Sequence, residues 1–235
     1  RRILMLIAKG ITFIKANSLL KFNENHDLYS VAWRRAVADS VKWIENYASN
    51  ALIMETKYHV HDYVINKLAH QKGIFLEFGV FEGESINRFS SALPDIKFIG
   101  FDSFEGLQED WSGSPMAKGH FSIGGILPKV NNNVSLKKGW INKTLPNFLN
   151  NNSMDDLLCV NIDVDTYETT VEIFEIIRPY LPKRKIYFLF DELVAYPNWQ
   201  NGEFKALQES THKFNLNYEF IAFGKHTALV EIDFT

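Results

Sequence analysis

From residue 74 onward, the chain alternates between two hydrophobic patterns. Short apolar runs are typical of buried parallel strands. Five such runs occur, at 74–78, 97–102, 134–138, 157–163 and 185–190. Helical periodicity separates most of them; in residues 167–177, for example, Val171, Phe174 and Ile177 share one face. Strands that alternate with helices predict an α/β fold with a mostly parallel sheet and right-handed crossovers.

The two ends of the chain add further elements. Residues 218–223 and 226–232 predict a closing hairpin around Gly224, which adds one antiparallel strand and brings the sheet to seven strands. Before the first strand, helical spacing predicts two helices, over residues 27–48 with Asp27 as N-cap, and over residues 54–70. We therefore expect a helical extension or cap over residues 1–72 and an α/β domain over residues 73–235, with helices on both faces of its sheet.

The N-terminal residues contain a short apolar run behind two arginines. Residues 3–8 are apolar, and Lys9 ends the run after six residues. That length is too short for the hydrophobic region of a signal peptide or for a membrane span, so no transmembrane segment is predicted. An amphipathic helix could pack on the domain, on a partner or on a membrane surface, and packing is the favoured alternative.

Charge and cysteine content exclude some classes of protein. The net charge of −3 argues against a general nucleic-acid binder, which should be basic. The single cysteine, Cys159, excludes an internal disulfide and favours a reducing, cytoplasmic compartment. Because it lies in an apolar run, we expect a buried, inert thiol.

Residues 74–85 combine an apolar run with Gly79, Gly83 and Ser85. Strand, glycine turn and helix, with Ser85 as a candidate N-cap, are typical of a nucleotide-like ligand site at the carboxyl edge of an α/β sheet. The stretch is not GxGxxG and has no phosphate-binding lysine, so an ordinary glycine-rich turn is the alternative.

Acidic residues recur where the predicted strands end. They are Glu77, Asp102, Asp163 with Asp165 two residues on, and Asp191 with Glu192. Parallel strands end at the same edge, so these carboxylates should converge and repel one another unless a hard cation such as Mg²⁺ joins them. Asp102 follows Gly83 by 19 residues, about where an acid binds ribose hydroxyls. Capping of the following helices is the alternative for each acid.

A long glycine-rich segment, residues 105–133, interrupts the alternation. Its length and its position after a strand end favour a substrate lid. His120 within it could contact substrate or act as a base, although an exposed loop histidine is the more frequent outcome. Two further candidates, Tyr196 and Trp199, could stack on a sugar ring or pack in the core.

Several of these segments together resemble a known family. The matching segments are residues 75–85, 100–107, 138–146 and 161–170, with residues 190–192 corresponding in place. The pairing of Phe-Asp-Ser-Phe-Glu-Gly with Asp-x-Asp-x-Tyr-Glu resembles class I S-adenosylmethionine-dependent methyltransferases with a Rossmann-like fold. More narrowly, it resembles the macrocin O-methyltransferase family, whose members methylate antibiotic sugars.

The resemblance implies a role for each matching residue. The cofactor would contact Glu77, Gly79, Gly83, Ser85, Asp102, Ser103, Phe104, Gly139, Trp140 and Asp163. Mg²⁺ would be held by Asp163, Asp191 and Glu192, and Asp165 would be the catalytic base beside Asp163. Glu192 departs from the aspartate found in many relatives, which makes metal occupancy the open point.

The resemblance implies an S-adenosylmethionine-dependent O-methyltransferase that uses Mg²⁺ and acts on a hydroxyl of a sugar or other polyhydroxylated small molecule. Two alternatives stay open: a metal-independent methyltransferase with another acceptor, and a cofactor-binding protein that has lost catalysis. A homodimer is also open, and the sequence identifies neither the acceptor nor the methylated position.

Overall fold

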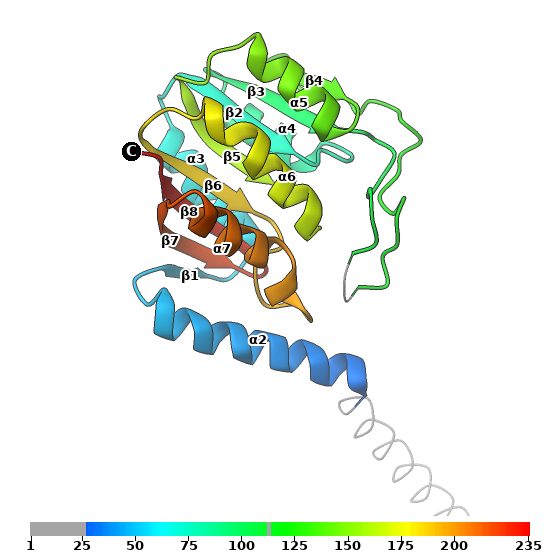
Figure 1. Cartoon of the computed structure of the whole chain (residues 1–235), viewed down its shortest axis with the longest axis vertical. Coiled ribbons are helices and arrows are strands. Elements are labelled where there is room, and N and C mark those ends of the chain that lie inside the picture. Colours follow the sequence, from blue (N-terminus) through cyan, green and yellow to red (C-terminus); the bar gives the residue numbers. More distant parts are fainter. Residues whose placement is uncertain (1–26, 112–113) are drawn as a thin grey trace, which may run out of the picture.

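A single eight-stranded sheet organises the computed structural model, which describes residues 27–111 and 114–235. The strand order is β1-β7-β8-β6-β5-β2-β3-β4 (Figure 1). The bounds are β1 Leu52–Met54, β2 Gly73–Phe78, β3 Ile96–Asp102, β4 Val134–Lys138, β5 Leu157–Ile162, β6 Lys185–Phe190, β7 Asn217–Gly224 and β8 Thr227–Asp233. Only β8 runs antiparallel to its neighbours, as the hairpin predicted.

The predicted count of seven strands is wrong by one. The additional strand is β1, which pairs in parallel with the outer side of β7. It is three residues long, and its Leu52 and Ile53 are exposed. So short and exposed a segment has no readable hydrophobic period, and we predicted that the second helix begins at its last residue, Met54.

The helices form two layers around the sheet (Figure 1). Their bounds are α2 Leu28–Tyr47, α3 Lys57–Leu68, α4 Glu84–Ala92, α5 Ile141–Asn150, α6 Tyr167–Ile177 and α7 Glu203–Lys213, with short 3₁₀ turns at Arg178–Tyr180 and Trp199–Asn201. Helices α5, α6 and α7 share one core cluster with buried residues of α2, whereas α3 and α4 belong to the cluster on the other face. This confirms helices on both faces. The apolar run at residues 3–8 lies outside the described residues.

Side-chain caps set the starts of the first two described helices. The Asp27 carboxylate accepts the Ser30 N–H at 2.9 Å, as predicted. Helix α3 begins at Lys57 because the Thr56 hydroxyl accepts the His59 N–H at 3.3 Å. The expectation that Ser85 caps the next helix is wrong: Gly83, in a left-handed conformation with φ 83°, is the N-cap of α4.

Helix α2 packs over the segment that follows β6. The Trp43 ring lies edge-on to the rings of Trp199, Phe204 and Phe220, at centroid distances of 6.3, 5.0 and 5.2 Å. The Ser40 hydroxyl accepts the Ala195 N–H at 2.8 Å. These contacts fix the loop after β6, which carries two of the predicted site residues. None of the helices between residues 27 and 235 that the structure describes is long and apolar enough to cross a bilayer.

Candidate functional site

A cavity of about 310 Å³ lies at the carboxyl ends of β2, β3, β5 and β6. Its walls come from the glycine loop after β2, the loop after β3, the start of α5, the acidic segments after β5 and β6, and helix α3. The strand ends stay aligned because the backbone ladder continues past them: Gly79 N–H donates to Phe101 O at 3.0 Å, and Asp163 N–H donates to Phe78 O at 2.9 Å. This register places residues from four strands around one space.

Asp102 organises the glycine loop. One oxygen of its carboxylate accepts the N–H groups of Val80 and Phe81, both at 2.8 Å, and the other accepts the Phe104 N–H at 2.6 Å. A carboxylate that accepts three backbone donors forms charge-assisted bonds that fix the loop. Asp102 also lines the cavity, so it joins the loop to the space where a ligand would lie.

Glu77 lies beneath the loop, fully buried. Its carboxyl accepts the Ser85 hydroxyl at 2.9 Å and the Asn161 amide at 3.1 Å. Burial raises its pKa to about 7, although these two hydrogen bonds oppose the shift. Ser85 therefore links α4 to β2, which is a different role from the helix cap that its position suggested.

Three acids meet beside the glycine loop, as their strand positions predicted. One carboxylate oxygen from each of Asp163, Asp191 and Glu192 lies within 4.8 Å of the others. Asp163 follows β5 and the other two follow β6, the neighbouring parallel strand. Adjacent parallel strands end side by side, which is why residues about 30 positions apart converge here.

Close approach of these acids changes their protonation. Burial is the main cause that raises the pKa of Asp163 well above its ordinary value. The negative charges of Asp191 and Asp165 raise it further. Burial and the same carboxylates raise the pKa of Glu192. The pKa of Asp165 rises to about 7 through burial and the charge of Asp191, against a hydrogen bond with Glu192. Without a cation, burial and mutual repulsion therefore favour protonation of these carboxyl groups.

Asp165 adopts a strained backbone conformation within the cluster. Its φ is 63°, in the left-handed region, and the Thr166 N–H donates to Val164 O at 2.7 Å. A bond across one residue with positive central φ is the rare form of γ-turn. Such strain in a non-glycine residue costs on the order of 1–3 kcal/mol and concentrates at functional sites. The turn leaves the Asp165 side chain in the cavity wall with 8% of its surface exposed.

The donor set of the triad suits a hard divalent cation. All three ligand atoms are carboxylate oxygens, which Mg²⁺ prefers. The Oε2 atom of Glu192 is buried without a hydrogen-bond partner in the described part of the chain. An orphaned carboxylate oxygen beside two more carboxylates is the arrangement that a cation would complete.

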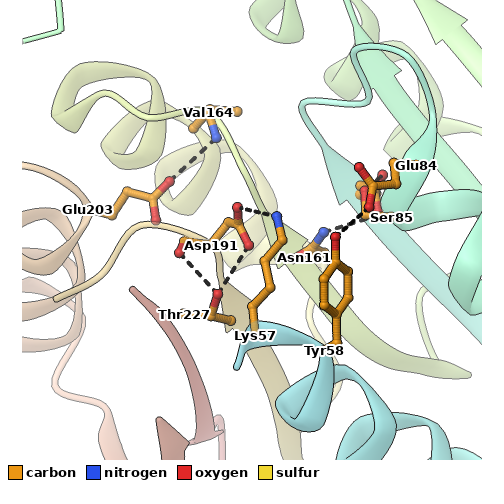
Figure 2. Close-up of polar contacts among 10 residues, drawn as sticks. Lys57, Tyr58, Glu84, Ser85, Asn161, Val164, Asp191, Glu203 and Thr227 are labelled. Atoms are coloured by element: carbon orange, nitrogen blue, oxygen red, sulfur yellow. Dashed lines mark hydrogen bonds and ion pairs between the residues drawn. The ribbon is translucent and has the colours of Figure 1, made fainter. Parts of the chain in front are cut away.

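Two residues that the sequence analysis missed contact Asp191. Figure 2 shows Lys57 reaching from α3, with its ammonium 3.2 Å from Asp191 Oδ2, and the Thr227 hydroxyl donating to Asp191 Oδ1 at 3.1 Å. Glu203, the first residue of α7, is fully buried and accepts the Val164 N–H at 3.4 Å (Figure 2). Nothing in the local sequence marks these residues, because each reaches the site only through the tertiary fold.

The other predicted positions divide into two groups. Those that line the cavity are Gly79, Ser85, Asp102, Ser103, Trp140, Asp163, Asp165, Asp191 and Glu192. Those outside its lining are Glu77, Gly83, Phe104 and Gly139, of which Phe104 packs in the core with 1% exposure. Tyr196 and Trp199 are likewise core residues, and Cys159 is the buried free thiol expected.

The long loop after β3 forms part of the cavity wall through Leu107, Gln108 and Phe121. Its far end is fastened to α4 by Asn131, whose amide donates to Asn87 O at 3.1 Å and Ser90 Oγ at 2.8 Å. His120 is exposed and lies outside the cavity lining. Closure of the loop over a ligand stays a prediction.

Comparison with known proteins shows similarity to methyltransferases, both in sequence and in fold. Residues 76–192 match the family model described as a methyltransferase domain. The calicheamicin methyltransferase CalS11 aligns with 72% of this chain and 76% of its own, at 23% identity and a TM-score of 0.57. The O-methyltransferase NovP aligns with 74% of this chain and 78% of its own, at 18% identity and a TM-score of 0.55.

A third similar structure is the MycE methyltransferase of the mycinamycin pathway, in complex with Mg and SAH. It aligns with 74% of this chain and 48% of its own, at 14% identity and a TM-score of 0.50. The comparison with curated proteins gave no match. Residues 76–192 therefore match a methyltransferase domain, and the chain has the fold of class I S-adenosylmethionine-dependent methyltransferases, which it shares with CalS11 and NovP.

Proposed function

We propose that this protein is a divalent-cation-dependent O-methyltransferase that transfers the methyl group of S-adenosylmethionine to a hydroxyl of a sugar or another polyhydroxylated small molecule. The observation that carries the proposal is the triad of Asp163, Asp191 and Glu192, whose oxygens lie within 4.8 Å of one another in the wall of the glycine-loop cavity. The TDP-rhamnose 3′-O-methyltransferase CalS11, the O-methyltransferase NovP and the Mg-bound MycE support it by similarity.

The residues around the cavity would have separate roles in binding the cofactor, holding the cation and accepting a proton. Asp102, with the glycine loop that it fixes, would hold the cofactor, and Trp140 would border its adenine. The triad would hold Mg²⁺, which when bound lowers the pKa of a coordinated hydroxyl. Asp165 would accept the acceptor proton, because its carboxyl faces the same cavity and its γ-turn fixes its position.

One observation favours a metal-independent enzyme as the second candidate. The Lys57 ammonium already contacts Asp191 and contributes a positive charge to the cluster. In that case the protein would bind cofactor and transfer methyl groups with a chelator present.

A cytoplasmic location remains part of the proposal, supported by the buried free thiol of Cys159.

Titration calorimetry with S-adenosylmethionine, with and without Mg²⁺, and methyl transfer to a panel of sugars test this proposal. We expect cofactor binding in both conditions and transfer only with the cation. Full transfer in chelator would support the metal-independent candidate. Cofactor binding without transfer to any acceptor, with or without the cation, would point to the degenerate binding protein.

A further inference from the structure

Lys57 approaches the acidic triad from outside the sheet. It is the first residue of α3, and its Nζ lies 3.2 Å from Asp191 Oδ2. The two side chains retain 34% and 12% exposure, so the pair lies at the inner wall of the cavity. Figure 2 shows the extended lysine chain pointing from α3 to the carboxylate. The acid that Lys57 contacts is one of the three proposed cation ligands.

The backbone that carries Lys57 is held firmly. Thr56 caps α3 through the His59 N–H. The helix start also presses against the end of β7: a β-carbon on Gly224 would lie 2.5 Å from Thr56 O and 2.7 Å from a methyl group of Val60. Only the flexible four-carbon chain of the lysine can therefore change position.

The ammonium and a divalent cation held by the triad would share one carboxylate, that of Asp191. Asp191 Oδ1 already accepts the Thr227 hydroxyl, and Oδ2 faces the ammonium. A Mg²⁺ ion lies about 2.1 Å from each ligand oxygen, which would leave the two cations within about 5 Å of each other. At that separation their repulsion in a half-buried site is large compared with the thermal energy.

We propose that Lys57 competes with the divalent cation for Asp191 and swings into the cavity when the cation binds. This inference rests on the cation site of the proposed function. Without the cation, the ammonium neutralises part of the carboxylate charge. With it, the ammonium is released toward the cavity space beside Tyr58 and His61, where it can donate to an oxygen of a bound ligand.

The test measures cation affinity in the full chain without cofactor, by electron paramagnetic resonance of free Mn²⁺ and by calorimetry with Mg²⁺. Lys57→Met and Lys57→Gln remove the charge and should bind both ions about fivefold to tenfold more tightly. Lys57→Arg retains a cation and should not gain affinity. Lys67→Met, on the exposed side of the same helix, is the matched control and should match the unaltered protein.

A second measurement follows the released side chain. Acylation of Lys57 by a water-soluble ester, read by mass spectrometry, should accelerate relative to Lys67 when Mg²⁺ is added. Unchanged or weaker ion binding in both uncharged variants, with the unaltered protein binding normally, would overturn the competition alone. If neither the unaltered protein nor the variants bind Mn²⁺ or Mg²⁺, the cation site of the proposed function fails as well.

Discussion

Gly79 lies directly against Asp163: a β-carbon on the glycine would sit 1.7 Å from the Asp163 carbonyl oxygen. The φ of Gly79 is 84°, so its backbone is also in the region that favours glycine. The contact joins the first residue of the glycine loop to the first acid after β5. The loop proposed to hold the cofactor and the cluster proposed to hold the cation are therefore one packed unit.

Substitution of Gly79 by alanine should disturb both parts of this unit. The added methyl group must push the Asp163 backbone away, so we expect a loss of about 3 kcal/mol or more in the free energy of unfolding. Gly119→Ala is the matched control, because Gly119 has φ 83° but open space around its Cα. It should cost only about 1 kcal/mol. Urea unfolding compares the two variants, and equal losses would show that the clash is relieved without cost.

Asp102 should contribute to both stability and cofactor affinity. Asp102→Ala leaves three backbone N–H groups without their acceptor, which should cost about 2–3 kcal/mol of stability. Affinity for S-adenosylmethionine should also fall by more than about tenfold if the carboxylate binds the ribose. Asp102→Asn, which keeps one oxygen acceptor, should lose less stability. Calorimetry on the folded variants measures affinity, and a normal dissociation constant in Asp102→Ala would remove the ribose role.

The sequence was most informative where one rule of parallel sheets applied. Five apolar runs and the closing hairpin predicted seven strands. The shared carboxyl edge predicted that Asp163, Asp191 and Glu192 would converge, and they do so because β5 and β6 are neighbours. The same rule does not predict the contact of Lys57 with Asp191, which is 134 residues away in the sequence. That contact depends on how α3 is docked on β7, and no periodicity records it.

The local sequence pattern also gave wrong predictions for residues whose contacts come from distant parts of the chain. Ser85 has the composition of a helix cap, but its hydroxyl is used by Glu77 eight residues earlier. Glu203 is the first residue of α7, and its complete burial next to the Asp165 turn follows from the packing of α7 on α6. Phe104 belongs to a matching family segment, yet it packs in the core. In each case the surroundings of the side chain are set by elements far away in sequence.

Asp165 should show a conflict between stability and activity. Asp165→Gly relieves the positive φ and removes a carboxylate from a repulsive cluster, so the free energy of unfolding should rise by about 1 kcal/mol. Asp165→Asn removes the charge and keeps the strain. Both should bind S-adenosylmethionine normally and lose about 10²- to 10⁴-fold in turnover if Asp165 is the base. Initial rates and urea unfolding provide the two readouts, and full turnover in either variant would assign the base elsewhere.

Glu77 should make stability depend on pH in a way that glutamine removes. Its native pKa of about 7 lies above the ordinary value of 4.5, so between these two values the folded protein holds a proton that the unfolded chain has released. The free energy of unfolding therefore falls as pH rises through this window, by on the order of 3 kcal/mol, and the penalty is complete above it.

Glu77→Gln keeps the shape and can still pair with Asn161 and Ser85, since the serine hydroxyl can accept as well as donate. The variant should match the unaltered protein at about pH 5 and exceed its stability at about pH 8. Urea unfolding in chelator at several pH values measures the difference in the free energy of unfolding between the two proteins. The other acids titrate in both proteins, so their contribution cancels in this difference. A stability difference between the two proteins that stays constant across this range would mean that Glu77 does not carry a raised pKa.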